Sequence, residues 1–251
     1  MNEGILLETR GLTREFKGFT AVQGVDLKVR SGAVHALIGP NGAGKTTVFN
    51  LLTKFLPVSA GTIHYKGEDI TAEPPAKTAR RGVVRSFQIS ATFPHLTVLE
   101  NVRIALQSRW GHSYAFWRNE RCLDELNLRA LELLDSVGLA DLAWTLAVEL
   151  PYGRKRALEL ATTLALEPEL MLLDEPTQGM GHEDVARIVE LIRKVSAGRT
   201  ILMVEHNLSV VANLCDTITV LQRGSILAEG DYATVANDSR VREAYMGTEA
   251  A

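Results

Sequence analysis

The sequence predicts an α/β fold, in which a parallel sheet is flanked by helices and interrupted by a helical insertion. Two continuous apolar runs, Val34–Ile38 and Leu170–Leu173, are typical of strands buried in a parallel sheet, and Thr200–Val204 is the next predicted strand. Helical patterns alternate with these runs. The best marked is Glu183–Val195, which has acids at its start and basic residues at its end. Strands that alternate with helices favour the α/β class.

Short strands surround a glycine-rich loop in the first third of the chain. Ile5–Thr9, the alternating segment Val25–Val29 and the glycine-flanked segment Thr62–Tyr65 are predicted strands. The loop 39–44 follows the buried run that ends at Ile38, and a helix is predicted from about Lys45 to Thr53.

The middle of the chain, from about Leu96 to Leu150, changes to helical spacing. Six apolar residues recur at intervals of three, four and one, and Gly138 marks a stop: Leu123, Leu126, Ala130, Leu131, Leu134 and Val137. This stretch is interpreted as an inserted helical subdomain.

The last third returns to strands and helices. A helix is predicted from about Lys155 to Leu166, ahead of Pro168. Ile218–Leu221 and Ile226–Ala228 are predicted to form a hairpin across an Arg-Gly-Ser turn.

Composition sets limits on function. The 251 residues are 46% hydrophobic and 23% charged, which is enough for a buried core. A formal charge of −3 gives no indication of nucleic-acid binding. Cys122 and Cys215 belong to no metal-spacing motif and are interpreted as reduced thiols. We expect no signal peptide and no membrane span, because no apolar run approaches about 18 residues.

The segment Gly39–Thr46 is a full match to the phosphate-loop pattern GxxxxGK[ST]. Its glycines let successive backbone N–H groups point at phosphate oxygens, and the following helix adds its positive dipole end. Lys45 is expected to reach the β and γ phosphates, and the Thr46 hydroxyl to ligate Mg²⁺. A chance glycine-rich turn is the alternative, but the loop lies between a buried strand and a helix, the context that the motif requires.

Two acids end a predicted buried strand. Asp174 and Glu175 directly follow the apolar run Leu170–Leu173. Ligands of open α/β sheets bind at the carboxyl ends of strands, so Asp174 is expected to hold Mg²⁺ and Glu175 to accept a proton from an attacking water. The alternative is that the strand simply ends in a solvated acidic turn. The phosphate loop makes this alternative improbable, because the loop needs an acidic partner.

Two further polar residues follow strands. His206 comes after Thr200–Val204 and is expected at the same sheet edge, where it could orient water on the γ-phosphate. Gln88 follows the candidate strand Val83–Phe87, and its amide could ligate Mg²⁺ or the water. Either residue alone would be uninformative.

The order of these motifs resembles the ATP-binding subunits of ABC transporters over essentially the whole chain. Between Gln88 and the acidic strand lies Leu150-Pro151-Tyr152-Gly153-Arg154, at the place of the family's LSGGQ-like signature. Leu150 and Gly153 match this signature. Pro151 replaces a serine and offers neither a hydroxyl nor an N–H group, and Arg154 replaces the final glutamine. The Gln178–Glu183 segment lies at the position of the family's D-loop, which runs along the dimer interface. Its sequence departs from the commoner SALD-type motif.

The resemblance implies a P-loop NTPase (RecA-like) core with a parallel sheet, an antiparallel β subdomain and an inserted α-helical subdomain. It places the ATP-binding domain at residues 5–248, with a catalytic core at 1–91 and 157–251 and the insert at 92–156. It implies ATP and Mg²⁺ as ligands and catalytic roles for Glu175, His206 and Lys45. Metal ligands would be Thr46, Gln88 and Asp174. The implied nucleotide contacts are Phe16, which would stack on adenine, and Gly39, Pro40, Asn41, Gly42, Ala43, Gly44, Lys45, Thr46, Thr47, Gln88, Leu150 and Gly153.

Three features are similar to the branched-chain amino acid importer ATPases. These are the signature Pro151-Tyr152-Gly153, the long helical insert around 110–135 and the ending Ala244-Tyr245-Met246-Gly247. The implied partners are a second ATPase subunit, transmembrane permease subunits and, indirectly, a solute-binding protein, with no nucleic acid. The implied location is cytoplasmic, peripheral on the inner face of the cell membrane. Gln88–Leu96 would carry movement to the permease, with Phe93 and Leu96 as apolar contacts.

Other functions remain open at this stage. An ABC ATPase of lipid or lipopolysaccharide extraction or export would have nearly the same motifs. A soluble, non-transport ABC ATPase usually has two cassettes in one chain or long arms, whereas this chain has one phosphate loop. A small-metabolite P-loop kinase would not explain Leu150–Arg154, and it would consume ATP only with an acceptor.

Overall fold

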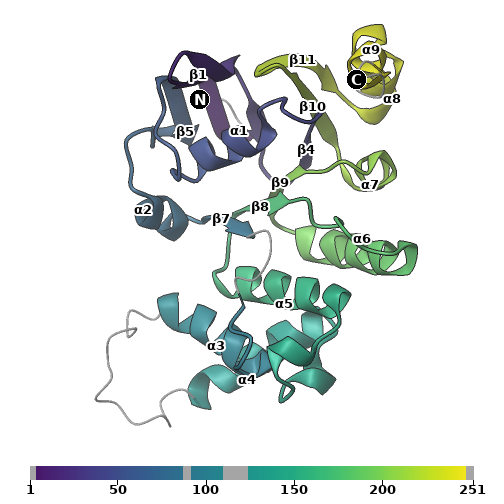
Figure 1. Cartoon of the computed structure of the whole chain (residues 1–251). Helices are drawn as coiled ribbons and strands as arrows, with labels where there is room; N and C mark the ends of the chain where they lie inside the picture. Colours follow the sequence, from purple (N-terminus) through teal and green to yellow (C-terminus); the bar gives the residue numbers. More distant parts are fainter. Residues whose placement is uncertain (1–3, 87–91, 110–123, 247–251) are drawn as a thin grey trace. The chain divides into compact units, whose positions relative to one another are not determined.

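The computed structural model describes residues 4–86, 92–109 and 124–246 (Figure 1). The chain divides into two compact units. Unit 1 comprises residues 1–84, 169–175 and 193–251, and unit 2 comprises residues 85–168 and 176–192. Unit 2 therefore contains the predicted 92–156 insert together with residues 85–91, 157–168 and 176–192, which the sequence analysis placed in the catalytic core. None of the described helices is long and apolar enough to cross a membrane.

Unit 1 contains a six-stranded sheet whose four central strands pair in parallel. The strand order is β11-β10-β4-β9-β8-β7. Every residue of β4, β8 and β9 is buried, which for β4 and β8 confirms the prediction from their continuous apolar runs. The bounds are β4 Val34–Ile38, β7 Val83–Ser86, β8 Leu170–Asp174, β9 Thr200–Val204, β10 Thr217–Gln222 and β11 Ser225–Gly230. β10 and β11 form the predicted antiparallel hairpin, and β10 also pairs in parallel with β4.

A second, antiparallel sheet has the order β2-β1-β5-β6, with β3 also paired to β1. Its strands are β1 Ile5–Phe16, β2 Phe19–Val25, β3 Lys28–Arg30, β5 Ala60–Tyr65 and β6 Glu68–Asp69. The single strand predicted at Val25–Val29 is wrong, because two strands meet there. Val25 pairs with Leu12, whereas Val29 pairs with Leu7. Both segments pair with β1, and the pairing is interrupted between them, where Leu27 N–H donates to the Thr9 hydroxyl at 2.9 Å.

Helices of unit 1 adjoin these sheets. They are α1 Lys45–Leu52, α2 Pro75–Arg80, α7 Leu208–Leu214, α8 Tyr232–Asn237 and α9 Ser239–Met246. α8 and α9 lie beside β11 (Figure 1). The core below the phosphate loop combines residues of both sheets with α1, whose Phe49 and Leu52 are fully buried.

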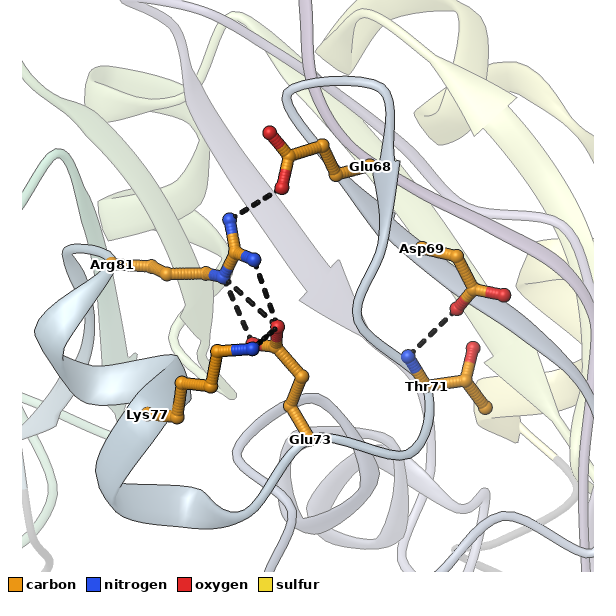
Figure 2. A network of polar contacts seen from close by, with 6 residues as sticks. All are labelled: Glu68, Asp69, Thr71, Glu73, Lys77 and Arg81. Atoms are coloured by element: carbon orange, nitrogen blue, oxygen red, sulfur yellow. Dashed lines mark hydrogen bonds and ion pairs between the residues drawn. The ribbon is translucent and has the colours of Figure 1, made fainter.

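An ion-pair network joins α2 to the β5–β6 hairpin (Figure 2). The Arg81 guanidinium donates to Glu73 at 2.8 and 2.9 Å and to Glu68 at 2.7 Å. Lys77 also contacts Glu73, at 2.8 Å. Hydrogen bonds from Arg81, and secondarily from Lys77, lower the pKa of Glu73, so this carboxylate stays ionised at neutral pH.

Unit 2 is helical. Its elements are α3 Val98–Arg109, α4 Asp124–Ser136, the 3₁₀ turns Ala140–Leu142 and Ala147–Glu149, α5 Tyr152–Ala165, and α6 His182–Ser196 as far as Ile192. α3, α4 and α5 pack on one another. The helix predicted from Lys155 begins three residues earlier, at Tyr152, because Pro151 is its N-cap.

Candidate ATP-hydrolysis site

The phosphate loop connects β4 to α1 and depends on two glycines. Gly39 has φ 146°, and a Cβ atom there would collide with the carbonyl oxygen of Leu221 on β10. Gly44 has φ 103°, and a Cβ atom there would lie 2.6 Å from the carbonyl oxygen of Ala21 on β2. Backbone from two distant strands thus holds the loop from outside, and only glycine fits at both positions.

Lys45 lies inside the loop. Its Nζ atom donates to the carbonyl oxygens of Gly39 at 2.7 Å and Pro40 at 3.0 Å, and the residue is only 6% exposed. Burial lowers the pKa of Lys45, while the negative charges of Glu175 and Asp174 oppose that shift. The Lys45 ammonium group therefore lies within the loop, where the motif requires a positive charge to bind phosphate.

Most of the remaining loop residues are accessible to solvent. Asn41, Gly42 and Thr46 are exposed, Pro40 and Thr47 are partly exposed, and Ala43 is buried. The Ala43 carbonyl accepts a hydrogen bond from Gly224 N–H at 3.0 Å, which ties the loop to the β10–β11 turn.

The donor set fits Mg²⁺ bound together with phosphate. Thr46 is an exposed residue with a hydroxyl in the first turn of α1, and Asp174 ends the buried strand β8, which β9 separates from β4 in the sheet. Among the described residues no group of three or more His, Cys, Asp and Glu side chains could hold a metal alone. Mg²⁺ commonly uses one or two carboxylates plus substrate phosphate oxygens, which suits this sparse set.

Glu175 and His206 meet at the carboxyl edge of the sheet, as the sequence predicts. The His206 Nε2 atom lies 2.9 Å from Glu175 Oε1. The contact follows from strand register: Asp174 pairs with Val204, and Glu175 N–H donates to the Val204 carbonyl at 2.9 Å. Glu175 has φ 47°, a left-handed conformation that costs energy in a non-glycine residue.

Glu205 was missed by sequence reasoning. It is 2% exposed, and its carboxylate accepts hydrogen bonds from the backbone N–H groups of His206 at 3.0 Å and Asn207 at 3.2 Å. These bonds fix the turn that carries the imidazole. The signal was present in the sequence, because a carboxylate directly before a strand-end histidine can cap the turn that follows it.

Phe16 ends β1 and is 37% exposed. The Arg14 guanidinium carbon lies 4.6 Å from the centre of its ring, a cation–π distance. Arg14 is also anchored by a hydrogen bond to the Pro57 carbonyl at 2.8 Å. The ring is thus held in place, and stacking on adenine stays a prediction.

The signature segment belongs to unit 2. Leu150 is buried, and Pro151 is the N-cap of α5 without a side-chain hydrogen bond, as expected for a residue that lacks a hydroxyl. Arg154 turns to the end of α4, where its Nη1 atom donates to the Gly138 carbonyl at 2.6 Å. Gln88 and its neighbours 87–91 lie outside the described residues.

A phosphate loop, an acid at the end of another strand of the same sheet and a carboxylate–imidazole pair at one sheet edge define a P-loop ATPase. The family described as ABC transporter matches residues 22–178, and a family described as branched-chain amino acid ATP-binding cassette transporter matches residues 225–251. The chain belongs to the ABC transporter ATP-binding family and is an ATPase of that family.

Similar proteins extend over nearly the full chain. The high-affinity branched-chain amino acid transport ATP-binding protein BraF of Pseudomonas aeruginosa is 38% identical, covering 96% of this chain and 98% of BraF. The corresponding protein LivG of Escherichia coli K12 is 36% identical, covering 96% and 98%. The ADP conformation of MJ1267, an ATP-binding cassette of an ABC transporter, superposes with a TM-score of 0.86 at 32% identity, covering 97% and 99%. These matches confirm the predicted family and fold class.

Proposed function

We propose that this protein is the energy-coupling ATPase of a branched-chain amino acid importer. The supporting observation is the combination of a full-length resemblance to BraF and LivG with the match of residues 225–251 to a branched-chain amino acid cassette family. The match of residues 225–251 is the stronger indication of the transported solute, because phosphate-loop motifs recur in every branch of the family.

The proposed chemistry is attack of water on the γ-phosphate of ATP. The bond between the γ-phosphorus and the β,γ-bridging oxygen breaks, releasing ADP and phosphate. Glu175 accepts the proton of the attacking water, and His206, 2.9 Å from it, orients that water and the carboxylate. Lys45 moves from the carbonyls of Gly39 and Pro40 to the phosphate oxygens.

Mg²⁺, held by Thr46 and Asp174 and in our proposal also by Gln88, would neutralise charge that develops on the phosphates. Phe16 stacks on the adenine ring. Leu150 and Gly153 serve the nucleotide of a second subunit, which is either a copy of this chain or a related ATPase. Pro151 leaves the α5 N-terminus without a serine hydroxyl, and this favours a related subunit that carries the stronger signature.

We propose a permease contact on an apolar surface of unit 2. Phe93, Trp144 and Val148 are 51%, 72% and 47% exposed. The two segments that carry them are held together, since Val148 N–H donates to the Pro94 carbonyl at 2.9 Å and Ala147 N–H to the Leu96 carbonyl at 2.9 Å. Leu96 itself is partly buried. Large exposed apolar side chains that share a rigid support mark interaction sites, and a permease partner would place the chain on the inner face of the membrane.

Uptake and co-purification test this function. Cells that lack the chain should lose saturable uptake of radiolabelled leucine, isoleucine and valine, and wild type but not Glu175→Gln should restore it. A gentle detergent pull-down from native membranes should recover permease subunits, a second ATPase and, through them, a solute-binding protein. Unchanged branched-chain uptake would reject the cargo. Recovery without any membrane partner would reject transport and favour a soluble ABC ATPase.

A further inference from the structure

The signature helix α5 and the segment after Glu175 are joined by one tyrosine hydroxyl. The Tyr152 hydroxyl donates to the Gln178 carbonyl at 3.0 Å, and both residues belong to unit 2. The hydroxyl also accepts a hydrogen bond from Arg156 Nη2 at 3.2 Å. Arginine has donors only, so the tyrosine oxygen must accept there, and its single hydrogen is left for Gln178.

Arg156 gives this hydroxyl a rigid support. Its Nη1 atom lies 2.7 Å from Glu159 Oε2, and the two side chains are 8% and 9% exposed. The guanidinium carbon also lies 5.6 Å from the centre of the Tyr152 ring. A cation that donates to the hydroxyl polarises it, which strengthens the bond from Tyr152 to the carbonyl.

Two further distances show that the same segments lie against each other. A Cβ atom on Gly179, which has φ 75°, would lie 3.7 Å from the Tyr152 hydroxyl. A Cβ atom on Gly153 would lie 3.0 Å from the carboxylate of Asp184, in the first turn of α6. The first turn of α5 is therefore packed on the chain between Gln178 and Asp184.

We propose that Tyr152 is a positioning residue of the ATPase reaction. Its hydroxyl anchors the segment that leaves Glu175, three residues before Gln178, to the first turn of the signature helix, so that the two are displaced together. This inference rests on the proposed roles of Glu175 and of the Leu150–Arg154 signature. Tyr152 is 45% exposed, so its hydroxyl contributes to orientation more than to the core.

Tyr152→Phe tests this inference, because it removes the hydroxyl and leaves the ring. In the full-length chain, in the assembly in which wild type turns over, we expect kcat to fall about tenfold, since small displacements of reacting groups are costly. The dissociation constant for ATP should stay at the wild-type value, as should the melting temperature. Amide hydrogen exchange across residues 177–181 should accelerate.

Tyr232→Phe is the matched control, because Tyr232 on α8 is 41% exposed, loses the same atom and lies in unit 1. It should change none of these quantities. Wild-type kcat and exchange in Tyr152→Phe would overturn the inference. Glu175→Gln separates the two proposals: if it keeps hydrolysing ATP, the role of Glu175 is wrong, whereas an inactive Glu175→Gln beside a fully active Tyr152→Phe rejects only the anchor.

Discussion

Glu175 Oε1 and His206 Nε2 lie 2.9 Å apart, although 31 residues separate them in the chain. Each follows a fully buried strand, and β8 and β9 are neighbours in the parallel sheet. Strand register therefore brings a carboxylate and an imidazole together at one edge. A buried Glu205 holds the turn that presents the imidazole.

Glu175→Gln and His206→Ala should both stop hydrolysis while leaving ATP binding intact. Loss of a general base lowers kcat by at least about 100-fold. Because the two groups act as a unit, the double variant should be little worse than either single one. Steady-state ATPase and nucleotide binding measure both effects. Glu132→Gln, an exposed acid on α4, is the control. Additive losses in the double variant would contradict the pair.

Gly44→Ala should abolish ATP binding by distorting the phosphate loop. Its Cβ atom would lie 2.6 Å from the Ala21 carbonyl oxygen, and the φ of 103° adds backbone strain. Gly32→Ala separates the two causes, because Gly32 has φ 74° but no atom within 4 Å of its Cβ position. Only Gly44→Ala should lose nucleotide in a binding titration. Equal affinities in the two variants would show that Ala21 does not constrain the loop.

His35 should make the protein less stable in acid. Its Nε2 atom lies 2.7 Å from the Thr219 hydroxyl, which itself donates to Glu229 at 2.6 Å, so the network assigns the hydrogen to His35 Nε2. Burial, and secondarily the charge of Arg30, lower the pKa of His35 from 6.5 to about 4. Between pH 6.5 and about 4, His35 is therefore protonated in the unfolded chain but neutral in the native state.

Stability should therefore fall between pH 6.5 and about 4, by up to about 3 kcal/mol from this residue. His35→Gln keeps a donor but does not titrate, so its denaturant midpoint should depend less on pH over that range. The midpoints of wild type and variant, measured at pH 7 and pH 5, give the comparison. Parallel pH profiles would exclude His35 as the source.

Lys54→Gly should stabilise the protein. Lys54 ends the turn after α1 with φ 65°, and its Nζ atom is buried without a hydrogen-bond partner among the described residues. Burial lowers its pKa from 10.5 to about 8, although Asp69 and Glu73 oppose the shift. Removing the left-handed strain alone should contribute about 1 kcal/mol, or roughly 2–4 °C in melting temperature.

The stabilisation should also depend on pH. Between about 8 and 10.5 the unfolded wild type binds more protons than the native state, so wild-type stability rises with pH and the advantage of Lys54→Gly shrinks. Lys17→Gly is the matched control, since Lys17 has φ 43° but is exposed. Equal gains for both variants would mean that the buried amine carries no cost.

The parts of the site that the sequence predicts are contiguous or sit at strand ends. Gly39–Thr46 is one segment, and the strand and helix that flank it are also visible in the sequence. The backbone that holds it, at Ala21 and Leu221, comes from strands whose contact with the loop depends on tertiary packing. The strand predicted at Val25–Val29 was wrong for a related reason, because alternation shows which side chains are buried but not that pairing with β1 is interrupted between Val25 and Lys28. The contact of Arg154 with Gly138 likewise has no local signal.

Tyr245 on α9 contacts the start of the phosphate loop. Its hydroxyl accepts a hydrogen bond from Gly39 N–H, and burial raises its pKa to about 12, so the hydroxyl is protonated at neutral pH. The residue lies in the segment 225–251 that matches the branched-chain amino acid cassette family. The phosphate loop is therefore supported by the C-terminal helix as well as by the residues of its own motif.

Tyr245→Phe should weaken ATP binding about three- to tenfold, the equivalent of one hydrogen bond, because Gly39 N–H loses its acceptor and the loop loses a support. The effect should appear in KM and in the nucleotide dissociation constant, with kcat nearly unchanged, since the Glu175–His206 pair is untouched. Tyr65→Phe is the matched control: its hydroxyl is also buried but has no hydrogen-bond partner among the described residues. If both variants bound ATP like wild type, the C-terminal helix would have no role in holding the loop.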